Sequence, residues 1–252
     1  MEISTFGGGG RLKECQRRLS LLTDKLSEKR LLLLPIPTTR DNKYISSSAT
    51  RLSELLPLCD KETLVAGYGI PCELKERMES VGAVVFDAAL DEDFLVRNAE
   101  ITARGAIGRL MCESTLDITD MKIGIIGYGR IGKQLLKLAL FLGAGVRVYT
   151  KRPEVMRDLS PLGIDCEIIG RESDLSSLDI VFNTAPEKII DEERIASLPE
   201  RIRIIDLASG NIFEPSARLT KLSSIPDAMY PETAGRLYAE AILKAIDGWV
   251  SK

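Results

Sequence analysis

The chain has 252 residues, of which 44% are hydrophobic and 28% are charged, a composition typical of a globular protein. Its 34 basic and 37 acidic residues leave a net charge of −3, which argues against a general surface for nucleic acid or anionic membranes. No apolar run approaches the ~20 residues that a membrane-spanning helix needs, and the first residues lack a signal-peptide pattern, so we expect a cytoplasmic protein.

Histidine is absent from the sequence, and the five cysteines are scattered without a CxxC pair. Hydrolysis by a Ser-His-Asp or Cys-His arrangement is therefore excluded. Without paired cysteines or any histidine, the sequence lacks the ligand pattern of a zinc site and the preferred ligand of most other transition-metal sites, so we expect no bound metal.

The first part of the chain alternates apolar, β-rich runs with helical patterns, which indicates a parallel sheet with crossover helices. The expected strands cover residues 3–6, 31–36, 63–66 and 83–86. The expected helices cover residues 12–29, 50–56 and 71–80, and a longer one follows at 97–113.

A second alternating series begins near residue 119. The expected strands cover residues 122–126, 145–149, 165–168, 180–183 and 203–206, with a sixth in the stretch SIPDA at 224–228. An amphipathic helix at 233–250 closes the chain.

These patterns predict an α/β protein with two doubly wound parallel-sheet domains. Residues 1–97 would form a flavodoxin-like substrate domain, residues 98–118 a connecting helix, and residues 119–232 a Rossmann dinucleotide-binding domain. The closing helix at 233–250 is a candidate to complete the first domain.

The stretch KIGIIGYGRIGKQLL contains a GxGxxG motif between a predicted strand and a predicted amphipathic helix. Its six residues are Gly127, Tyr128, Gly129, Arg130, Ile131 and Gly132. A second strand, GVRVYT, completes the βαβ unit in which such a turn binds the pyrophosphate of a dinucleotide. A glycine-rich turn without a ligand is the alternative, and no Walker A motif is present.

The end of that second strand bears on the choice between NAD and NADP. NAD-binding domains place an Asp or Glu there to hold the ribose 2′-OH, whereas this chain has Thr150, Lys151 and Arg152. A hydroxyl and two cations suit the 2′-phosphate of NADP, so we predict NADP over NAD. The alternative is that Lys151 and Arg152 are solvated turn residues.

Two later strand ends carry polar or small residues at the edge where ligands of such sheets bind. The residues that we expect to contact the cofactor there are Asn183, Thr184 and Pro186 in NTAP, and Leu207 and Ala208 in DLAS. Plain turn chemistry is the alternative explanation of each stretch.

Together with FGGGGR, AEITARGAI and YPETAGRL, these stretches resemble the family of the A subunit of dipicolinate synthase. That family carries a GGDxR-like turn, a TxEG-type helix, GxGxxG, NTxP and DLAS strand ends, and a PxTAG helix start, in this order. More distantly, the layout is similar to the D-2-hydroxyacid dehydrogenases and to adenosylhomocysteinase.

The resemblance implies oxidation of a dihydrodipicolinate-type precursor to pyridine-2,6-dicarboxylate, with NADP as hydride acceptor. It also implies a second subunit of flavoprotein-like type and a setting in the mother cell of a sporulating bacterium, and such folds often form homo-oligomers. The sequence departs from the family at Gly9, in place of the acid of GGDxR, and at Arg104, in place of the glutamate of TxEG. The first domain is also about one βα unit short.

A dicarboxylate substrate calls for cations and hydroxyls. Our candidates for the substrate site are Arg11, Arg40, Arg104, Ser209 and Glu232, with Thr38 and Thr39 beside them. Each arginine has a solvated surface role as its alternative, and Glu232 is either a base or a first-turn charge that favours the helix dipole. The His–Glu mechanism of D-2-hydroxyacid dehydrogenases is excluded here, but desaturation of a partly reduced pyridine ring needs only a modest base.

Two other functions stay open at this point. One is an oxidoreductase that acts on another 2-oxo or imino acid in the same cleft. The other is a regulatory subunit that binds NADP and catalyses nothing.

Overall fold

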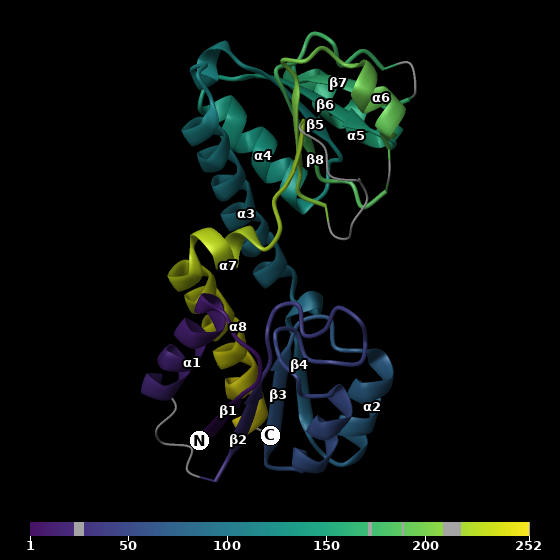
Figure 1. Ribbon diagram of the computed structural model, residues 1–252. Coiled ribbons are helices and arrows are strands. Elements are labelled where there is room, and N and C mark those ends of the chain that lie inside the picture. The colour runs from purple at the N-terminus through teal and green to yellow at the C-terminus, as the bar shows by residue number, and fades with distance from the viewer. Residues whose placement is uncertain (23–27, 171–172, 188, 209–217, 252) are drawn as a thin grey trace. The chain divides into compact units, whose positions relative to one another are not determined.

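The computed structural model describes residues 1–22, 28–170, 173–187, 189–208 and 218–251. These residues divide into two compact units, Met1–Asn98 with Pro226–Lys252, and Ala99–Ile225. Both units are built on a parallel sheet (Figure 1), so the predicted α/β class with two parallel sheets is confirmed.

Among the described residues of the first unit, four parallel strands lie in the order β1-β2-β3-β4, with β1 at one edge. Its strands are β1 (Glu2–Thr5), β2 (Arg30–Leu33), β3 (Thr63–Gly67) and β4 (Val84–Asp87). Its helices are α1 (Gly10–Leu22), the 3-10 helices η1 (Leu52–Leu58) and η2 (Ala88–Leu90), α2 (Cys72–Ser80), α7 (Ile225–Met229) and α8 (Pro231–Val250). The central strands β2 and β3 are continuous apolar runs because both of their faces are covered.

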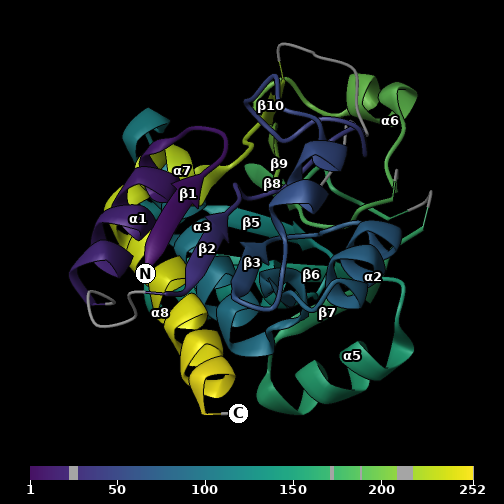
Figure 2. The ribbon, with the colours of Figure 1, turned by 90° about the horizontal axis from the view of Figure 1, so that it is seen from below.

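One face of this sheet packs against η1 and α2, with Leu32, Val65 and Met78 in a common core. The C-terminal helix α8 packs along α1, as Figures 1 and 2 both show. Tyr238 of α8 is fully buried, and its hydroxyl donates to the carbonyl oxygen of Leu34, 3.2 Å away, just beyond β2. The closing helix therefore belongs to the first unit although it lies at the end of the chain.

In the described residues of the second unit, six parallel strands lie in the order β10-β9-β8-β5-β6-β7. The order in which the chain adds strands reverses between β5 and β8, as in a doubly wound sheet. Its strands are β5 (Lys122–Ile126), β6 (Gly145–Thr150), β7 (Asp165–Ile168), β8 (Ile180–Asn183), β9 (Arg203–Asp206) and β10 (Leu219–Lys221). Its helices are most of α3 (Glu92–Glu113), α4 (Arg130–Phe141), α5 (Pro153–Leu159) and α6 (Glu192–Ser197), with the 3-10 helices η3 (Ile118–Asp120) and η4 (Ser160–Leu162).

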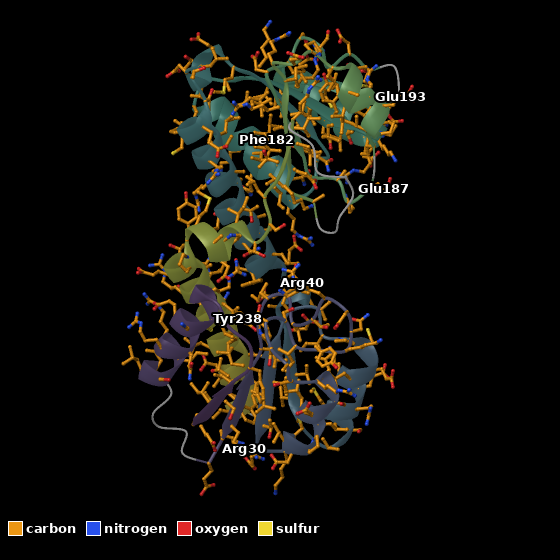
Figure 3. All side chains as sticks on the ribbon, viewed as in Figure 1. Arg30, Arg40, Phe182, Glu187, Glu193 and Tyr238 are labelled. Atoms are coloured by element: carbon orange, nitrogen blue, oxygen red, sulfur yellow. The ribbon has the colours of Figure 1, made fainter. Side chains whose placement is uncertain are left out.

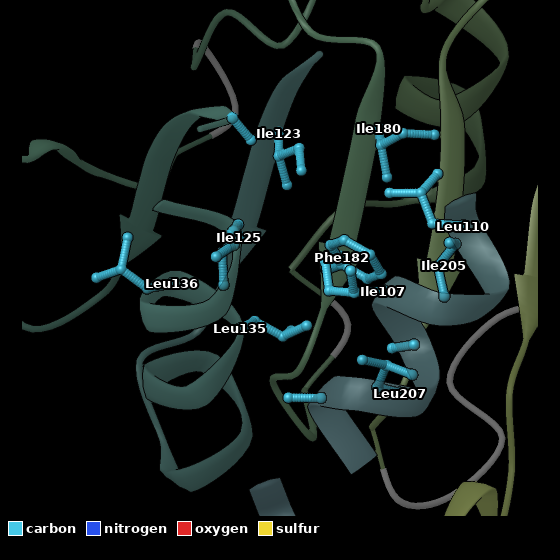
Figure 4. Packing of buried hydrophobic residues seen from close by; sticks show 14 of the residues in the cluster. Ile107, Leu110, Ile123, Ile125, Leu135, Leu136, Ile180, Phe182, Ile205 and Leu207 are labelled. Carbon is cyan, nitrogen blue, oxygen red and sulfur yellow. The ribbon is translucent and has the colours of Figure 1, made fainter. Parts of the chain in front are cut away.

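Side chains along these strands alternate between two cores, as the period of a strand requires. Ile123, Ile125 and Phe182 face α3 and α4 (Figure 4) in a core that α5 also joins. Ile126 and Val181 face the other core, which includes α6. The sheet is thus covered by apolar cores on both faces. Polar groups of the sheet can therefore meet a ligand only at the ends of the strands.

The structure corrects three of the predicted elements. The stretch at 224–228 is not a strand, because α7 occupies it, and the sixth strand is the short β10 just before it. Residues 50–56 contain the 3-10 helix η1 in place of an α-helix, and α3 begins at Glu92, five residues before the predicted start. Among the described residues, no helix combines the length and hydrophobicity of a membrane span.

Candidate functional site

The glycine-rich turn of the second unit lies where the strand order reverses. Strand β5 pairs with β6 on one side and with β8 on the other, so the connections from β5 and β8 leave in opposite directions. In a sheet of this kind the crevice at the carboxyl ends of such a strand pair is the ligand-binding position. The sequence motif and the topology therefore mark the same place.

The glycines of the turn are there for different steric reasons. Gly127 has a φ of +93°, which favours glycine, and a Cβ on it would lie 2.7 Å from the Thr184 hydroxyl oxygen. A Cβ on Gly132 would lie 2.2 Å from the Gly127 carbonyl oxygen, whereas one on Gly129 would meet no atom of the described residues within 4 Å. Gly127 and Gly132 are thus required by the protein itself, and Gly129 leaves open space where a ligand can approach the backbone.

The start of α4 suits an anion. The N-cap residue Gly129 offers no side-chain cap, and the first turn contains no acidic residue. The first N–H groups of a helix lack intrahelical partners, and the helix dipole adds positive potential there. Arg130 is exposed at this end, while Tyr128 and Ile131 are partly buried against the core. These residues fit the pyrophosphate of a dinucleotide.

The end of β6 presents the residues predicted to select NADP. Thr150 is buried, and its hydroxyl oxygen accepts from the Arg152 backbone N–H at 3.1 Å. The Arg152 guanidinium donates to the Tyr128 carbonyl oxygen at 2.7 Å and so ties this turn to the glycine turn. Lys151 pairs with Glu187 at 2.6 Å, and its hydrogen bond and charge lower the pKa of the Glu187 carboxyl from its ordinary value. Sequence reasoning missed Glu187 (Figure 3), which is 36 residues away and lies in no recognised motif.

A buried polar network joins the ends of β8, β9 and β10. Asp206 is 1% exposed, and its carboxylate accepts from the Asn183 amide at 2.8 Å, the Ala208 N–H at 3.1 Å and the Lys221 ammonium at 2.6 Å. Lys221 also donates to the Ala208 carbonyl oxygen. This network fixes residues 206–208 at the end of β9, and no signal in the sequence pointed to Lys221.

The other residues predicted to contact the cofactor follow the ends of β8 and β9. The Thr184 hydroxyl donates to the Ile126 carbonyl oxygen at 3.0 Å, which holds the β8 turn against the glycine turn. Pro186 is exposed, and Leu207 and Ala208 are buried. Ser209 lies outside the described residues.

Arg11 belongs to the first unit, in the first turn of α1. It is only 6% exposed, and its backbone N–H donates to Asp227 at 2.8 Å. Burial lowers the pKa of Arg11, which the charge of Asp227 opposes. Asp227 was not among the predicted site residues, yet it lies against the turn: a Cβ on Gly9 would be 2.9 Å from its Oδ2.

The remaining predicted residues are more exposed. Arg40 projects beyond β2 (Figure 3), and Arg104 pairs with Glu100 at 3.1 Å on α3 of the second unit. Glu232 is exposed in the first turn of α8, where a negative charge favours the helix dipole.

Thr38 and Thr39, the two threonines beside Arg40, make hydrogen bonds within the first unit. The Thr38 hydroxyl accepts from the Tyr68 N–H at 2.8 Å, and the Thr39 hydroxyl accepts from the Asn42 N–H at 3.1 Å. Both contacts order the loop that follows β2.

Comparison with known proteins agrees with this geometry. Residues 96–228 match the family model described as D-isomer specific 2-hydroxyacid dehydrogenase, NAD binding domain. Glyoxylate reductase of Thermococcus onnurineus is 26% identical over 137 residues, 53% of this chain and 40% of its own length. The chain thus matches well under two thirds of the length of such curated relatives.

The A subunit of dipicolinate synthase from Bacillus subtilis is 23% identical over 163 residues, 62% of this chain and 55% of its own length. The resemblance to this protein that the sequence suggested is therefore confirmed. The solved structure of the same subunit from Bacillus halodurans has a TM-score of 0.79 at 20% identity and covers 97% of both chains. That likeness shows a common fold.

The family match covers the glycine turn, the end of β6 and the network at β8 and β9, which are the parts that fit a nicotinamide dinucleotide. The chain belongs to the D-isomer specific 2-hydroxyacid dehydrogenase NAD-binding domain family.

Proposed function

We propose that this protein is an NADP-dependent oxidoreductase that converts a dihydrodipicolinate-type precursor to dipicolinate. The observation that supports a dinucleotide cofactor is the glycine turn at the strand reversal, with Gly129 open to a ligand and no side-chain cap from the N-cap residue of α4. The substrate rests on similarity to the A subunit of dipicolinate synthase, which extends along most of the chain at the level of fold.

The preference for NADP rests on the end of β6. Lys151 and Arg152 stand where an NAD-binding domain places a carboxylate for the ribose 2′-OH, and Thr150 leaves no negative charge there. Glu187 moderates this preference because it already pairs with Lys151. In the proposal a 2′-phosphate displaces Glu187 from Lys151.

The chemistry suits a site without histidine. Forming the aromatic ring removes a hydride from one ring carbon and a proton from the neighbouring carbon. The nicotinamide, when bound, accepts the hydride, and a carboxylate such as Glu232, or water, accepts the proton. Asn183, Thr184, Pro186, Leu207 and Ala208 would hold the cofactor, while cations hold the substrate carboxylates, so that orientation supplies most of the rate.

The other parts of the proposal concern its setting. We assign Arg40, Arg104 and Ser209 to the substrate site, together with a cytoplasmic setting in a sporulating cell, a homo-oligomer and a flavoprotein-like second subunit. The three residues follow from the cations and hydroxyls that a dicarboxylate needs, and the cytoplasmic setting follows from the sequence pattern. The sporulating cell, the homo-oligomer and the second subunit follow from the resemblance.

The test uses the purified full chain, NADP or NAD, and the precursor generated in the reaction vessel, with and without a flavoprotein-like subunit. Nicotinamide reduction and the ultraviolet spectrum of dipicolinate are followed together. We expect dipicolinate to form faster with NADP than with NAD. NADP binding without product in either condition would contradict the substrate. It would favour another 2-oxo or imino acid, or a regulatory role in a chain that has no histidine.

A further inference from the structure

Unpaired buried polar atoms gather around the glycine turn of the first unit. Three buried side-chain atoms that flank this turn lack a hydrogen-bond partner among the described residues: Thr5 Oγ1, Arg11 Nε and Ser46 Oγ. Thr5 ends β1, Arg11 follows the turn, and the carbonyl oxygen of Ser46 lies 2.8 Å from a Cβ built on Gly7. Buried polar groups normally have partners, so this concentration indicates a polar ligand.

Arg11 is the charged member of this group. It is 6% exposed, yet its guanidinium, which carries five N–H donors, makes no hydrogen bond to another described residue. The carboxylate nearest to it, Asp227, accepts from the Arg11 backbone N–H. Burying a charge without a hydrogen-bonding partner is costly, and the charge of Asp227 offsets only part of that cost, so stability alone does not explain the position of this cation.

Asp227 restricts the kind of anion that fits here. Its Oδ1 accepts the Arg11 N–H at the start of α1, and its Oδ2 lies beside Gly9. Gly10 is covered as well, because a Cβ on it would be 2.7 Å from Pro231 Cβ. Asp227 and Pro231 therefore occupy the N-terminal end of α1 that a phosphate would use. The carboxylate of Asp227 would also repel a doubly charged phosphate. A planar, singly charged carboxylate instead matches the fork of N–H donors on Arg11.

We propose that Arg11 binds a carboxylate group of the substrate and that Asp227 is a positioning residue, which fixes the first turn of α1 and selects carboxylate over phosphate. Thr5 and Ser46 offer hydroxyls to the same group. The inference rests on the proposed function only in calling this ligand the substrate.

The first experiment measures binding in the full chain without turnover. Malonate and inorganic phosphate are titrated by calorimetry, and amide hydrogen exchange is followed over residues 6–15. We expect malonate to bind more tightly than phosphate and to slow exchange in this segment. Absence of malonate binding, or binding without protection there, would overturn the proposal. If Arg11-dependent binding is found but the precursor is not oxidised, the proposed function fails and the carboxylate site stands.

Variants separate binding from folding. Arg11→Met should weaken malonate binding by about 10- to 100-fold, the loss expected for charge-assisted hydrogen bonds, while thermal stability stays equal or rises. Arg18→Met is the matched control, because Arg18 lies on the same helix, is partly buried and is already paired with Glu14 at 2.7 Å, so malonate affinity should not change. Arg11→Lys should fold and bind with intermediate affinity, since the charge remains and the fork is lost.

Two outcomes with these variants would contradict the inference. An Arg11→Met chain that unfolds would show that Arg11 is a structural residue, and full affinity in Arg11→Lys would remove the need for a guanidinium. Asp227→Asn tests the positioning residue separately. It should shift the ratio of malonate to phosphate affinity toward phosphate, and an unchanged ratio would show that Asp227 does not select the anion.

Discussion

Gly132 lies directly against Gly127 in the turn that begins α4. A Cβ on Gly132 would be 2.2 Å from the Gly127 carbonyl oxygen, a distance that backbone atoms cannot relieve without moving the turn. Gly129, two residues after Gly127, has open space beside it, because a Cβ there would meet nothing within 4 Å in the described part of the chain. One motif therefore contains glycines that the fold needs and a glycine that only a ligand needs.

Substitutions at Gly132 and Gly129 should separate stability from binding. We expect Gly132→Ala to lower the free energy of unfolding by about 2 kcal/mol or more, because the helix must shift away from β5. Gly129→Ala should leave the melting temperature of the free protein unchanged and weaken NADPH binding by about tenfold, since the new methyl group occupies ligand space. Thermal unfolding and a fluorescence titration with NADPH measure the two effects. Equal behaviour of the two variants would contradict this division.

The sequence predicts the second unit well because its signals are local. The apolar run before Gly127, the amphipathic helix after it and the spacing of the strands all follow from short stretches, and the strand ends at Asn183 and Asp206 fall as predicted. Lys221 was missed because its partner Asp206 is 15 residues away and β10 has only three residues.

In the first unit, contacts between residues far apart in the sequence were even harder to predict. Asp227 reaches Arg11 across 216 residues of sequence, and no periodicity connects a residue of α7 with the start of α1. Arg11 was selected by its position after a glycine turn, whereas its burial and its unpaired Nε are products of tertiary packing. The prediction of a strand at residues 224–228 was wrong because Pro226 fits the first turn of a helix.

The Asp206–Lys221 pair should be the most sensitive ion pair of the second unit. Lys221→Met leaves the carboxylate of Asp206 buried without its cation, so we expect a loss of about 3 kcal/mol in the free energy of unfolding. Adding Asp206→Asn removes the unpaired charge and should recover part of that loss. Urea denaturation of the two single variants and the double variant measures the coupling.

A surface pair serves as the control for this prediction. Lys244 pairs with Asp93 at 2.8 Å with both side chains mostly exposed, so Lys244→Met should lose less than about 1 kcal/mol. If Lys221→Met is no worse than Lys244→Met, the buried network does not stabilise the DLAS turn.

Lys151 should set the preference for NADP. Lys151→Ala is expected to weaken NADP binding by about tenfold and to leave NAD binding nearly unchanged, because only NADP carries the 2′-phosphate. Glu187→Gln should act in the opposite direction, since it frees Lys151 from the pair. Dissociation constants of both cofactors, measured at one ionic strength, give the comparison. An equal loss for NAD and NADP in Lys151→Ala would place Lys151 outside the ribose site.

Alkaline pH should destabilise the first unit through two of its thiols. Burial raises the pKa of Cys59 to about 11, and it raises the pKa of the buried Cys15 as well. A raised pKa means that the folded protein keeps its proton longer than the unfolded chain does. The stabilising contribution of Cys59 is therefore complete below its ordinary pKa near 9 and is lost as the pH rises to about 11.

The measurement is the free energy of unfolding from urea titrations at pH 7, 9 and 10.5 in the presence of a reductant. We expect the wild type to lose stability between pH 9 and 10.5, and Cys59→Ala to lose less over the same interval, because alanine has no proton to release. Other groups titrate equally in both proteins, so the difference between them isolates the thiol. Parallel pH profiles would mean that Cys59 ionises in the folded protein as easily as in the unfolded chain, and that its Sγ is not held protonated against the Leu55 carbonyl oxygen 3.3 Å away.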